Sequence, residues 1–392
     1  MASPISPASP AAPNQSALKE PAYLAQARAW NPSSLPDIKA ASLQTVLPRL
    51  LSHPNIAARC RITGKTEQSG LPGTMMEPGS DAGVVGSQLD GVEQLIALAS
   101  CGNGRFCHLN PRRGLQIALV ECLHRLACTG AVPLAITSRL AISDPVKPEE
   151  SSPLGECLNG LQEAATFFGL PDLGQGISLA GQTAVGAIDP VPTVSVLGQI
   201  RQGKHLTRRW AHTAGEKLVF LGATPAELGG SQYLGVIHQL NAGDAPQCDL
   251  VAAQKLDQAL LALITAGQVH GAHPVAEGGL LCCIAEMLFA PGQSFGATLD
   301  LATLQGSRLD ALLFGESQNR AVIIVATERL GSVLADAHLR GVSAAVIGEI
   351  TANPVLTVRG ATDEAVSWPV AELRRGWETS LESRIKLPVF IA

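Results

Sequence analysis

The segment 101–130 constrains the fold most, because in it a turn-rich loop leads directly into an apolar helix. Asn110 is a typical N-cap residue, and Pro111 suits the first helical position, where a missing N–H costs nothing. Leucines then recur at helical spacing until Gly130, where the helix is expected to end: Leu115, Leu119, Leu123 and Leu126. Such a loop directs backbone N–H groups and the positive end of the helix dipole at whatever lies in front of the helix.

The residues around this helix start favour a phosphate as the ligand. Glycines allow a close approach of the backbone, and polar side chains stand beside the free N–H groups: Gly102, Asn103, Gly104, Arg105, Arg112 and Arg113. The alternative is a glycine-rich turn whose arginines are only solvated. Composition alone leaves both interpretations open.

Composition sets the broad class of protein. A chain of 392 residues with 46% apolar residues can form two cores, so we expect two domains of roughly 150 to 200 residues each. Low aromatic content, 39 glycines and 26 prolines indicate a mixed α and β fold with many tight connections. The net charge of −5 gives no reason to expect nucleic-acid or membrane binding, and no run of residues is long and apolar enough for a membrane helix.

The nine cysteines favour a reduced, cytosolic protein. They form no CxxC pair, and several lie inside apolar helical runs, as small core residues do. Cys101, Cys107 and His108 lack a clear fourth ligand for a metal site. Residues 1–19 are rich in Ala, Ser and Pro and lack the basic and apolar regions of a signal peptide, so we expect 1–39 to be a flexible tail and linker.

Apolar periodicity predicts most other elements. We expect helices near 43–59, 152–169 (capped by Ser152) and 249–266, a further helix that starts at the glycine turn ELGGSQYL, and strands at 132–137, 192–200 and 217–222. A composition change at 213–217 is the expected boundary between an N-terminal domain, 40–212, and a C-terminal domain, 213–392. Arg208 and Arg209, just before it, are interpreted as a solvated pair.

Two later motifs place polar groups at the ends of elements. Gly278 and Gly279 form a turn before an apolar helix, which repeats the pattern at 101–130 and predicts a second anion site. The motif GESQNR lies immediately before the apolar strand AVIIVA, so its polar groups can converge on a ligand at the start of that strand: Glu316, Ser317, Gln318 and Arg320. A plain polar turn is the alternative.

Several ordered motifs resemble the second half of phosphoribosylformylglycinamidine synthase (formylglycinamide ribonucleotide amidotransferase), of the aminoimidazole-ribonucleotide-synthase superfamily. They extend from about Glu20 to Arg320 and include EPGSDAG, GNGR, PLAIT, KPEE, PTVSVLGQI, LGATPAELGGSQYL, HPVAEGGL and LFGESQNR. The resemblance implies a mixed α/β fold in which an N-terminal sheet domain pairs across a dimer and is followed by a C-terminal α/β domain. It also implies ATP and Mg²⁺ as cofactors, with Asp81 and Glu277 as metal candidates and His273 at the substrate site.

Departures from the family motifs predict a preserved fold with an impaired nucleotide site. The Asp that follows PLAIT in the family is Ser138 here, HDxSDGG has become HPVAEGG at 273–279, and the Asp of DPYxG is Asn110. GNVSLYNE corresponds to 175–182 and QYDH to 65–68, each with altered polar residues. Losing carboxylates removes ligands that Mg²⁺ prefers, so we expect weak nucleotide binding that depends little on Mg²⁺.

Three functions remain open. The first is an ATP-dependent C–N ligase that amidates an amide carbonyl through an iminophosphate, works as a homodimer or with a first-half paralogue, and takes ammonia from an external source. The second is a catalytically degenerate subunit or scaffold derived from that enzyme. The third is another ATP-dependent phosphotransferase of the superfamily. An unpaired sheet edge predicts dimerisation in each case.

Overall fold

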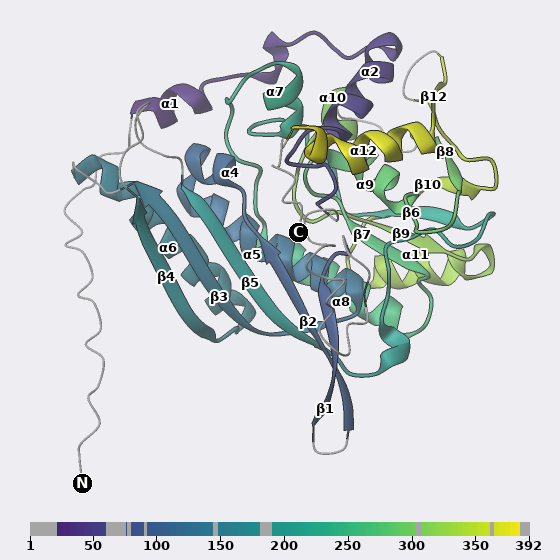
Figure 1. Cartoon of the computed structure of the whole chain (residues 1–392), viewed down its shortest axis with the longest axis horizontal. Coiled ribbons are helices and arrows are strands. Elements are labelled where there is room, and N and C mark those ends of the chain that lie inside the picture. Colours follow the sequence, from purple (N-terminus) through teal and green to yellow (C-terminus); the bar gives the residue numbers. More distant parts are fainter. Residues whose placement is uncertain are drawn as a thin grey trace, which may run out of the picture.

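The computed structural model describes residues 22–59, 76, 80–89, 92–143, 148–180, 190–302, 304, 308–360 and 364–384. The motif at 65–68, Gly79, and the last two residues of the motif at 175–182 lie outside the described residues. Two sheets, one of five strands and one of seven, organise the chain (Figure 1). The mixed α/β fold expected from the sequence is confirmed.

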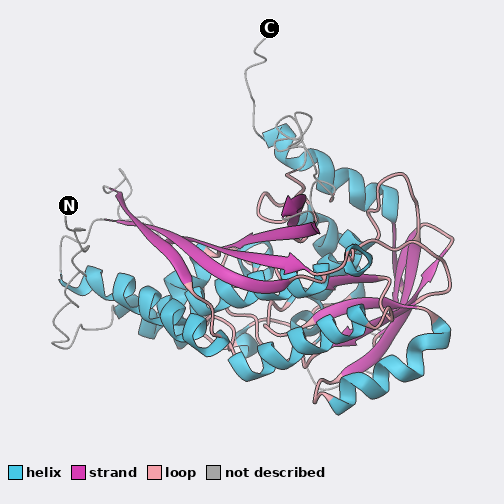
Figure 2. Cartoon of the chain, turned by 90° about the horizontal axis from the view of Figure 1, so that it is seen from below, coloured by secondary structure: helices cyan, strands magenta, loops and turns pink. Residues whose placement is uncertain are grey.

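Among the described residues, helices cover one face of the first sheet and leave the other face bare. Its order is β1-β2-β5-β3-β4, and it is formed by Gly83–Leu89, Val92–Cys101, Val191–Ile200, Val132–Ser143 and Asp172–Ala180. Among the described strands of this sheet, β3 and β4 pair in parallel and the other pairs are antiparallel. Helices α5 (Pro111–Thr129) and α6 (Pro148–Phe168) lie along one side of the sheet (Figure 2). Apolar side chains are exposed on its strands, among them Leu98, Leu134, Ile177, Leu179 and Val191.

Helix α5 begins and ends as its sequence predicts. The side chain of Asn110 accepts a hydrogen bond from the N–H of Arg113, and Pro111 is the first helical residue. Gly130 ends the helix with φ of 87°, and a Cβ there would lie 2.1 Å from the carbonyl oxygen of His205. The loop before α5 differs from the prediction, because residues Gly104–Leu109 form a short helix, α4, capped by Asn103.

The second sheet is covered on both faces. Its order is β12-β11-β8-β10-β6-β9-β7, and its strands are Val366–Pro369, Val355–Arg359, Gly296–Asp300, Ala344–Thr351, Lys217–Leu221, Ala321–Val325 and Gly271–Pro274. In β6, Leu218 and Phe220 belong to one apolar cluster, and Val219 and Leu221 belong to another. This burial of both faces explains why β6 is a continuous apolar run.

Helices of the second domain pack on opposite sides of this sheet. One cluster includes side chains from α7 (Gln232–Ile237), α9 (Gly279–Met287), α10 (Leu309–Phe314) and α12 (Val370–Arg384). The other includes side chains from α8 (Leu250–Thr265) and α11 (Leu330–Leu339). Asp249 caps α8 by accepting hydrogen bonds from Val251 and Ala252, which confirms the helix predicted at 249–266.

The N-terminal segment from Ala22 onward differs from the expected flexible linker. It forms α1 (Ala22–Arg28) and a 3-10 turn, Pro32–Ser34, and the Leu24 side chain is buried. Helix α2 (Ala40–Leu51) buries the five apolar residues that the periodicity indicated. These residues pack in the core of the second domain. Helix α2 therefore belongs with the second domain by its contacts, although the predicted boundaries placed it in the first.

Two other predicted elements have different bounds. Strand β3 continues to Ser143 because it pairs with both β4 and β5 along its length. Helix α6 begins at Pro148, so Ser152 lies inside the helix and the prediction that it is the cap was wrong. Between Ile200 and Lys217 the chain passes from the first sheet to the second, with a 3-10 turn at Gly203–His205.

Candidate functional site

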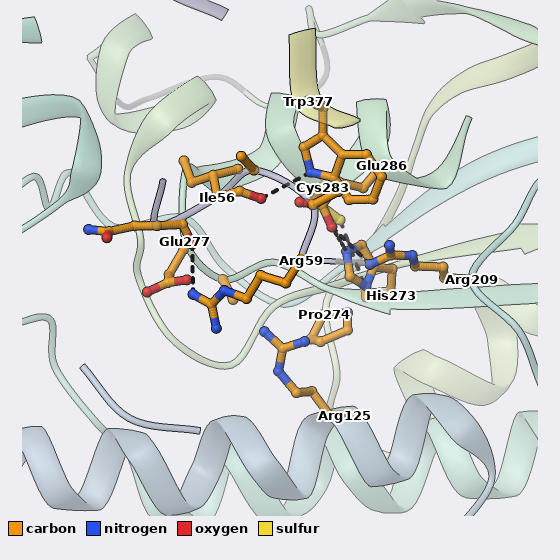
Figure 3. Close-up of a pocket in the computed structure, with 14 residues that line it drawn as sticks. Ile56, Arg59, Arg125, Arg209, His273, Pro274, Glu277, Cys283, Glu286 and Trp377 are labelled. Carbon is orange, nitrogen blue, oxygen red and sulfur yellow. Dashed lines mark hydrogen bonds and ion pairs between the residues drawn. The ribbon is translucent and has the colours of Figure 1, made fainter. Parts of the chain in front are cut away.

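A pocket of about 220 Å³ lies where the two domains meet (Figure 3). Its wall is built from residues 55–59 after α2, Arg125 of α5, Arg209, strand β7 and the turn after it, α9, and Trp377 of α12. Trp377 is held in place by a hydrogen bond of 3.0 Å from its indole N–H to the carbonyl oxygen of Ile56. The pocket therefore draws on elements from both ends of the chain.

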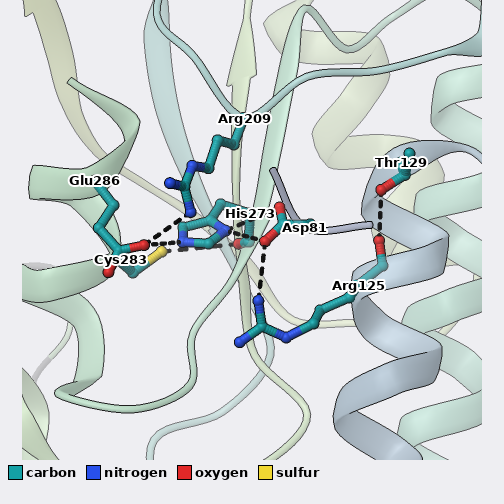
Figure 4. A network of polar contacts seen from close by, with 7 residues as sticks. All are labelled: Asp81, Arg125, Thr129, Arg209, His273, Cys283 and Glu286. Atoms are coloured by element: carbon teal, nitrogen blue, oxygen red, sulfur yellow. Dashed lines mark hydrogen bonds and ion pairs between the residues drawn. The ribbon is translucent and has the colours of Figure 1, made fainter. Parts of the chain in front are cut away.

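A buried network of charged groups forms one wall of the pocket (Figure 4). The Nδ1 atom of His273 lies 3.0 Å from Oδ2 of Asp81, and its Nε2 atom lies 3.2 Å from Oε2 of Glu286. Because both ring nitrogens face carboxylates, both must donate, and His273 carries a positive charge. Burial opposes that charge, but Asp81 and Glu286 outweigh burial and raise the pKa of His273.

Arg209 belongs to this network, so the prediction that it is part of a solvated pair was wrong. Its side chain is 4% exposed, and its Nη1 atom donates to Oε2 of Glu286 at 2.9 Å. The guanidinium carbon lies 4.4 Å from the centre of the Trp210 ring, which adds a cation–π contact. The Nε and Nη2 atoms of Arg209 are buried without a hydrogen-bond partner in the structure. Buried donors of this kind are suited to a ligand that brings an acceptor.

Arg125 lies among carboxylates on the α5 side of the pocket. Its Nη1 atom donates to Oδ1 of Asp81 at 3.4 Å, and its side chain extends from α5 toward Pro274 (Figure 3). Burial lowers the pKa of Arg125, but Cys101 and the carboxyl groups of Asp81, Glu121 and Glu277 raise it above its usual range. Arg125 is therefore a fixed cation in this part of the pocket.

The metal candidates Asp81 and Glu277 do not fit Mg²⁺ in this structure. Both carboxylate oxygens of Asp81 are already engaged by His273 and Arg125. Burial, followed by repulsion from Glu121 and Glu316, raises the pKa of Glu277 to about 8, so its carboxyl group is mostly protonated at neutral pH. Within the described ranges, no group of three or more His, Cys, Asp or Glu side chains could hold a metal ion, Cys101, Cys107 and His108 included. Mg²⁺ needs a larger set of oxygen ligands.

The loop predicted to bind phosphate uses most of its donors internally. Asn103 accepts hydrogen bonds from the N–H groups of Arg105 and Phe106. Arg113 donates to Asp244 at 2.7 Å and to the carbonyl oxygen of Ala245 at 2.6 Å. Arg105 donates to the carbonyl oxygen of Ser231 at 3.1 Å, while its Nη2 atom and Nδ2 of Asn103 are buried without a partner. Phosphate binding by this loop stays a prediction. Nη2 of Arg105 and Nδ2 of Asn103 are the donors that would be available to a phosphate.

The glycines of this loop have a packing role. A Cβ at Gly102 would lie 2.0 Å from the carbonyl oxygen of Pro192, and one at Gly104 would lie 2.8 Å from that of Pro190. The side chain of Arg112 points elsewhere and forms ion pairs with Glu156 and Glu163 of α6. Both glycines are therefore explained by close contact with the chain that enters β5.

The GESQNR motif is buried and joins two helix starts. One oxygen of Glu316 accepts hydrogen bonds from the N–H groups of Gln232 and Gly278, both at 2.8 Å. The fully buried Arg320 donates to the carbonyl oxygens of Ser317 and Gly315 at 2.8 Å and 2.6 Å. Gln318 donates to the carbonyl oxygen of Glu316 at 3.0 Å. The motif shapes the turn at Gly278 and Gly279, whereas its predicted contact with a substrate stays a prediction.

The structure divides the predicted site residues into two groups. His273, Glu277 and Asp81 lie in or beside the pocket, and Glu316 and Gly278 meet behind it. Sequence analysis missed the pocket roles of Arg125, Glu286 and Trp377. A signal was present for Arg125, because it lies four positions after Glu121 in the leucine-rich middle of the helix, where charged residues are unusual.

Comparison with known proteins gives two family matches. The model of the AIR synthase related protein, N-terminal domain, matches residues 79–200, and that of the C-terminal domain matches residues 213–361. Together the matches cover more than half of the chain.

Curated relatives are similar over most of this chain. The phosphoribosylformylglycinamidine synthase subunit PurL of Symbiobacterium thermophilum is 36% identical over 360 residues, which is 85% of this chain and 46% of the relative. PurL of Moorella thermoacetica is 35% identical over 364 residues, which is 93% of this chain and 48% of that relative. The chain thus spans about half the length of these relatives.

Solved structures share the fold at lower identity. Thermotoga maritima PurL complexed with FGAR gives a TM-score of 0.67 at 19% identity, with coverage of 85% of this chain and 53% of that one. The protein tt0281 from Thermus thermophilus gives a TM-score of 0.53 at 20% identity, with coverage of 78% of this chain and 98% of that one. Within the ranges that the structure describes, no helix is long and apolar enough to cross a membrane.

Proposed function

Because this chain belongs to the family of AIR synthase related proteins, we propose that it is one half of an ATP-dependent C–N ligase and works with a partner half. The reaction would convert an amide to an amidine. ATP would transfer its γ-phosphoryl group to the amide oxygen, with release of ADP and of a proton from the amide nitrogen, to give an iminophosphate; ammonia would then add to the carbon, and the C–O bond would break to release phosphate and leave the amidine. The motifs of this chain resemble the second half of the synthase, and its length fits one half of the curated PurL relatives.

The observation that carries the partner requirement is the bare face of the first sheet. Helices cover the other face, while Leu98 and Leu134 are 49% and 43% exposed on neighbouring parts of the sheet. Exposed apolar side chains on a broad sheet face favour an interface with another chain. A homodimer, or a heterodimer with a first-half paralogue, would cover this face.

The pocket supports the ligase proposal through its charged groups. Arg209 has buried donors without partners, and Arg125 supplies a second positive charge on the opposite wall. Preorganised donors of this kind stabilise the charge that develops when a phosphoryl group is transferred. His273 contacts both Asp81 and Glu286 and so links these two carboxylates in the wall of the pocket. ATP is the proposed cofactor, ammonia comes from an external source, and a cytosolic location fits the free cysteines.

The ligase proposal is tested with the purified chain, ATP, Mg²⁺, ammonia and formylglycinamide ribonucleotide. We expect no amidine product from the chain alone, because the partner half and its positioned electrostatic groups are then missing. Losing even one such group commonly costs about a hundredfold in rate. Adding a first-half synthase chain should produce turnover. In that assembly Arg320→Ala should reduce the rate more than Arg105→Ala, because Arg320 holds the GESQNR turn. Robust turnover by the chain alone, absent from an Arg320→Ala preparation, would contradict the partner requirement.

The loop predicted to bind phosphate uses most of its donors internally. This favours a second candidate function, a non-catalytic subunit derived from the enzyme. Arg113 and Arg112 are paired with acidic side chains, and the metal candidates do not fit Mg²⁺. Such a subunit would bind the first-half chain, yet turnover by the assembly would be unchanged by Arg209→Gln. A large loss of turnover in Arg209→Gln supports the ligase instead.

Dimerisation is tested by light scattering at micromolar concentration. We expect a dimer, and Leu98→Arg should shift it toward monomer by placing a charge on the bare sheet face. A stable monomer that captures no first-half chain would remove the partner from the proposal.

A further inference from the structure

His124 is a buried histidine that contacts both domains outside the pocket. Its side chain is 3% exposed on α5, and its Nδ1 atom lies 2.6 Å from Oδ1 of Asp257 on α8. Its Nε2 atom lies 3.2 Å from Oδ1 of Asn319, in the turn before β9. Helix α5 contributes side chains to the core of the first sheet, whereas α8 packs on the second sheet, so one imidazole ring joins the two domains.

These two contacts fix where the protons of His124 lie. Nδ2 of Asn319 donates to the carbonyl oxygen of Asp249 at 2.8 Å, so Oδ1 is the atom turned toward the ring, and it can only accept. Nε2 of His124 therefore carries a hydrogen. Because Nδ1 donates to the carboxylate of Asp257, both ring nitrogens are protonated and the ring is positively charged.

The surroundings of the ring favour this charge. Burial lowers the pKa of His124, but the carboxylate of Asp257 and the hydrogen bond at Nε2 raise the pKa above its ordinary value of 6.5. On α5 itself, Glu121 acts in the same direction, while Arg125 is paired with Asp81. From the turn before β9, the ring faces a neutral amide.

Asn319 has an unusual backbone conformation that its side-chain contacts hold in place. Its φ of 62° lies in the left-handed region, which few residues other than glycine adopt. The side chain is held on two sides, by His124 and by the carbonyl oxygen of Asp249. The chain is also tightly packed here, since a Cβ at Gly222 would lie 2.2 Å from the carbonyl oxygen of Asn319. Losing the contact with His124 should therefore loosen this turn.

The same turn reaches the backbone behind the pocket. Glu316 lies three residues before Asn319 in the GESQNR motif, and its carboxylate accepts a hydrogen bond of 2.8 Å from the N–H of Gly278. Gly278 directly follows Glu277, which lines the pocket. His124 is thus connected to the pocket wall through one turn of the chain.

We propose that protonated His124 is an interdomain clamp, whose two N–H donors hold Asp257 of α8 and Asn319 of the GESQNR turn against α5, and that loss of one proton at alkaline pH releases the turn. His124 is a positioning residue, because it does not line the pocket. Since its pKa is raised, the clamp is complete below pH 6.5 and is lost as the pH rises through the raised pKa. The clamp needs no ligand, so it does not rest on the proposed function.

The charge on His124 is tested by NMR of the full chain with 15N-labelled histidine. Both ring nitrogens should have the chemical shifts of protonated nitrogens at about pH 7. Spectra of His124→Gln and His124→Arg, in which the signals of this ring are absent, assign them. A ring with a single protonated nitrogen at this pH would overturn the proposal.

Hydrogen exchange of the backbone at 315–320 measures the clamp itself, at about pH 6 and about pH 10, after correction for the intrinsic effect of pH. The wild type should exchange at least about tenfold faster at the higher pH. His124→Arg carries a permanent charge and several donors, so it should stay protected at both values, whereas His124→Gln should exchange fast at both. His270→Gln, which removes an exposed histidine paired with Glu216, is the matched control and should behave as the wild type does.

Asp257→Asn is a milder variant for the case in which His124→Gln does not fold. It keeps an acceptor for Nδ1 but removes the negative charge, so the faster exchange should begin at a lower pH than in the wild type. An unchanged onset in folded Asp257→Asn, or the same pH dependence in His124→Arg as in the wild type, would overturn the proposal. No step needs a partner chain or turnover, so a failed ligase assay leaves these results intact.

Discussion

Two glycine-containing helix starts, one at α4 and α5 and the other at α9, satisfy their backbone N–H groups in different ways. At the first, the partners are local, because Asn103 and Asn110 accept from residues two or three positions further on. At the second, Gly278 donates to Glu316, which is 38 residues away. The sequence pattern is similar at both, but the first is stabilised by neutral amides and the second by a buried carboxylate.

This difference explains why a glycine turn before a helix is an incomplete predictor of an anion site. The N–H groups are present in both places, and the protein's own acceptors occupy many of them. A bound anion must compete with these acceptors. Donors left without partners, such as those of Arg209, are a better guide.

The largest expected effect is at the carboxylate-capped start. Glu316→Ala should lower the free energy of unfolding by roughly 3 to 5 kcal/mol, because it leaves the N–H groups of Gln232 and Gly278 buried without an acceptor. Urea unfolding followed by circular dichroism measures this change. Glu316→Gln keeps an acceptor oxygen and should cost less. A loss below about 1 kcal/mol in Glu316→Ala would mean that the two starts are alike.

The pH dependence of stability should also separate the two starts. Burial raises the pKa of Glu277 to about 8, above the 4.5 expected for an unfolded chain. The folded state therefore holds its proton more tightly, so this stabilisation is complete below pH 4.5 and is lost as the pH rises through 8. The wild type should lose on the order of 2 to 4 kcal/mol between about pH 5 and pH 9, and Glu277→Gln should lose less.

Urea midpoints at both pH values for the two proteins test this prediction. His273, whose pKa is also raised, is present in both proteins, so the difference between the curves reports the proton of Glu277 together with its coupling to Glu121 and Glu316. Parallel curves would show that Glu277 is ionised in the folded protein at neutral pH.

The amide-capped start should show a smaller effect. Asn110→Ala should cost about 1 kcal/mol, because it removes the acceptor for the N–H of Arg113. Asn110→Ser retains an acceptor oxygen for the N–H of Arg113 and should cost less than Asn110→Ala, although both variants lose the hydrogen bond of 2.9 Å that the Asn110 amide donates to Asp244. Thermal unfolding monitored by circular dichroism compares the three proteins. A cost for Asn110→Ala as large as that of Glu316→Ala would remove the contrast between local and remote caps.

The smallest expected effect is at Arg112, which follows the same local cap. Its ion pairs with Glu156 and Glu163 are on the surface, with side chains 48%, 43% and 43% exposed. Arg112→Gln should change stability by less than about 0.5 kcal/mol, and about 1 M NaCl should erase even this. A change above about 1.5 kcal/mol in urea unfolding would show that the pair anchors α5 to α6.

Sequence reasoning predicted what depends on neighbours along the chain. The cap of α5, its end at Gly130 and the apolar face of α2 follow from a few residues each, and the structure has them. The ion pair of Asp81 with His273 joins residues 192 positions apart, and no local pattern indicates it. Arg209 was misread for the same reason, because its partner Glu286 lies 77 residues further on.

Helix α5 has a consequence for how the molecule unfolds. Its leucines, such as Leu119, belong to the core of the first sheet, whereas Ala127 and Cys128 belong to the cluster between the second sheet and α8. Helix α5 is thus packed in the cores of both domains, so unfolding of one core should disrupt the other. We expect the chain to unfold as one cooperative unit with a single calorimetric transition, because α5 contributes side chains to both cores.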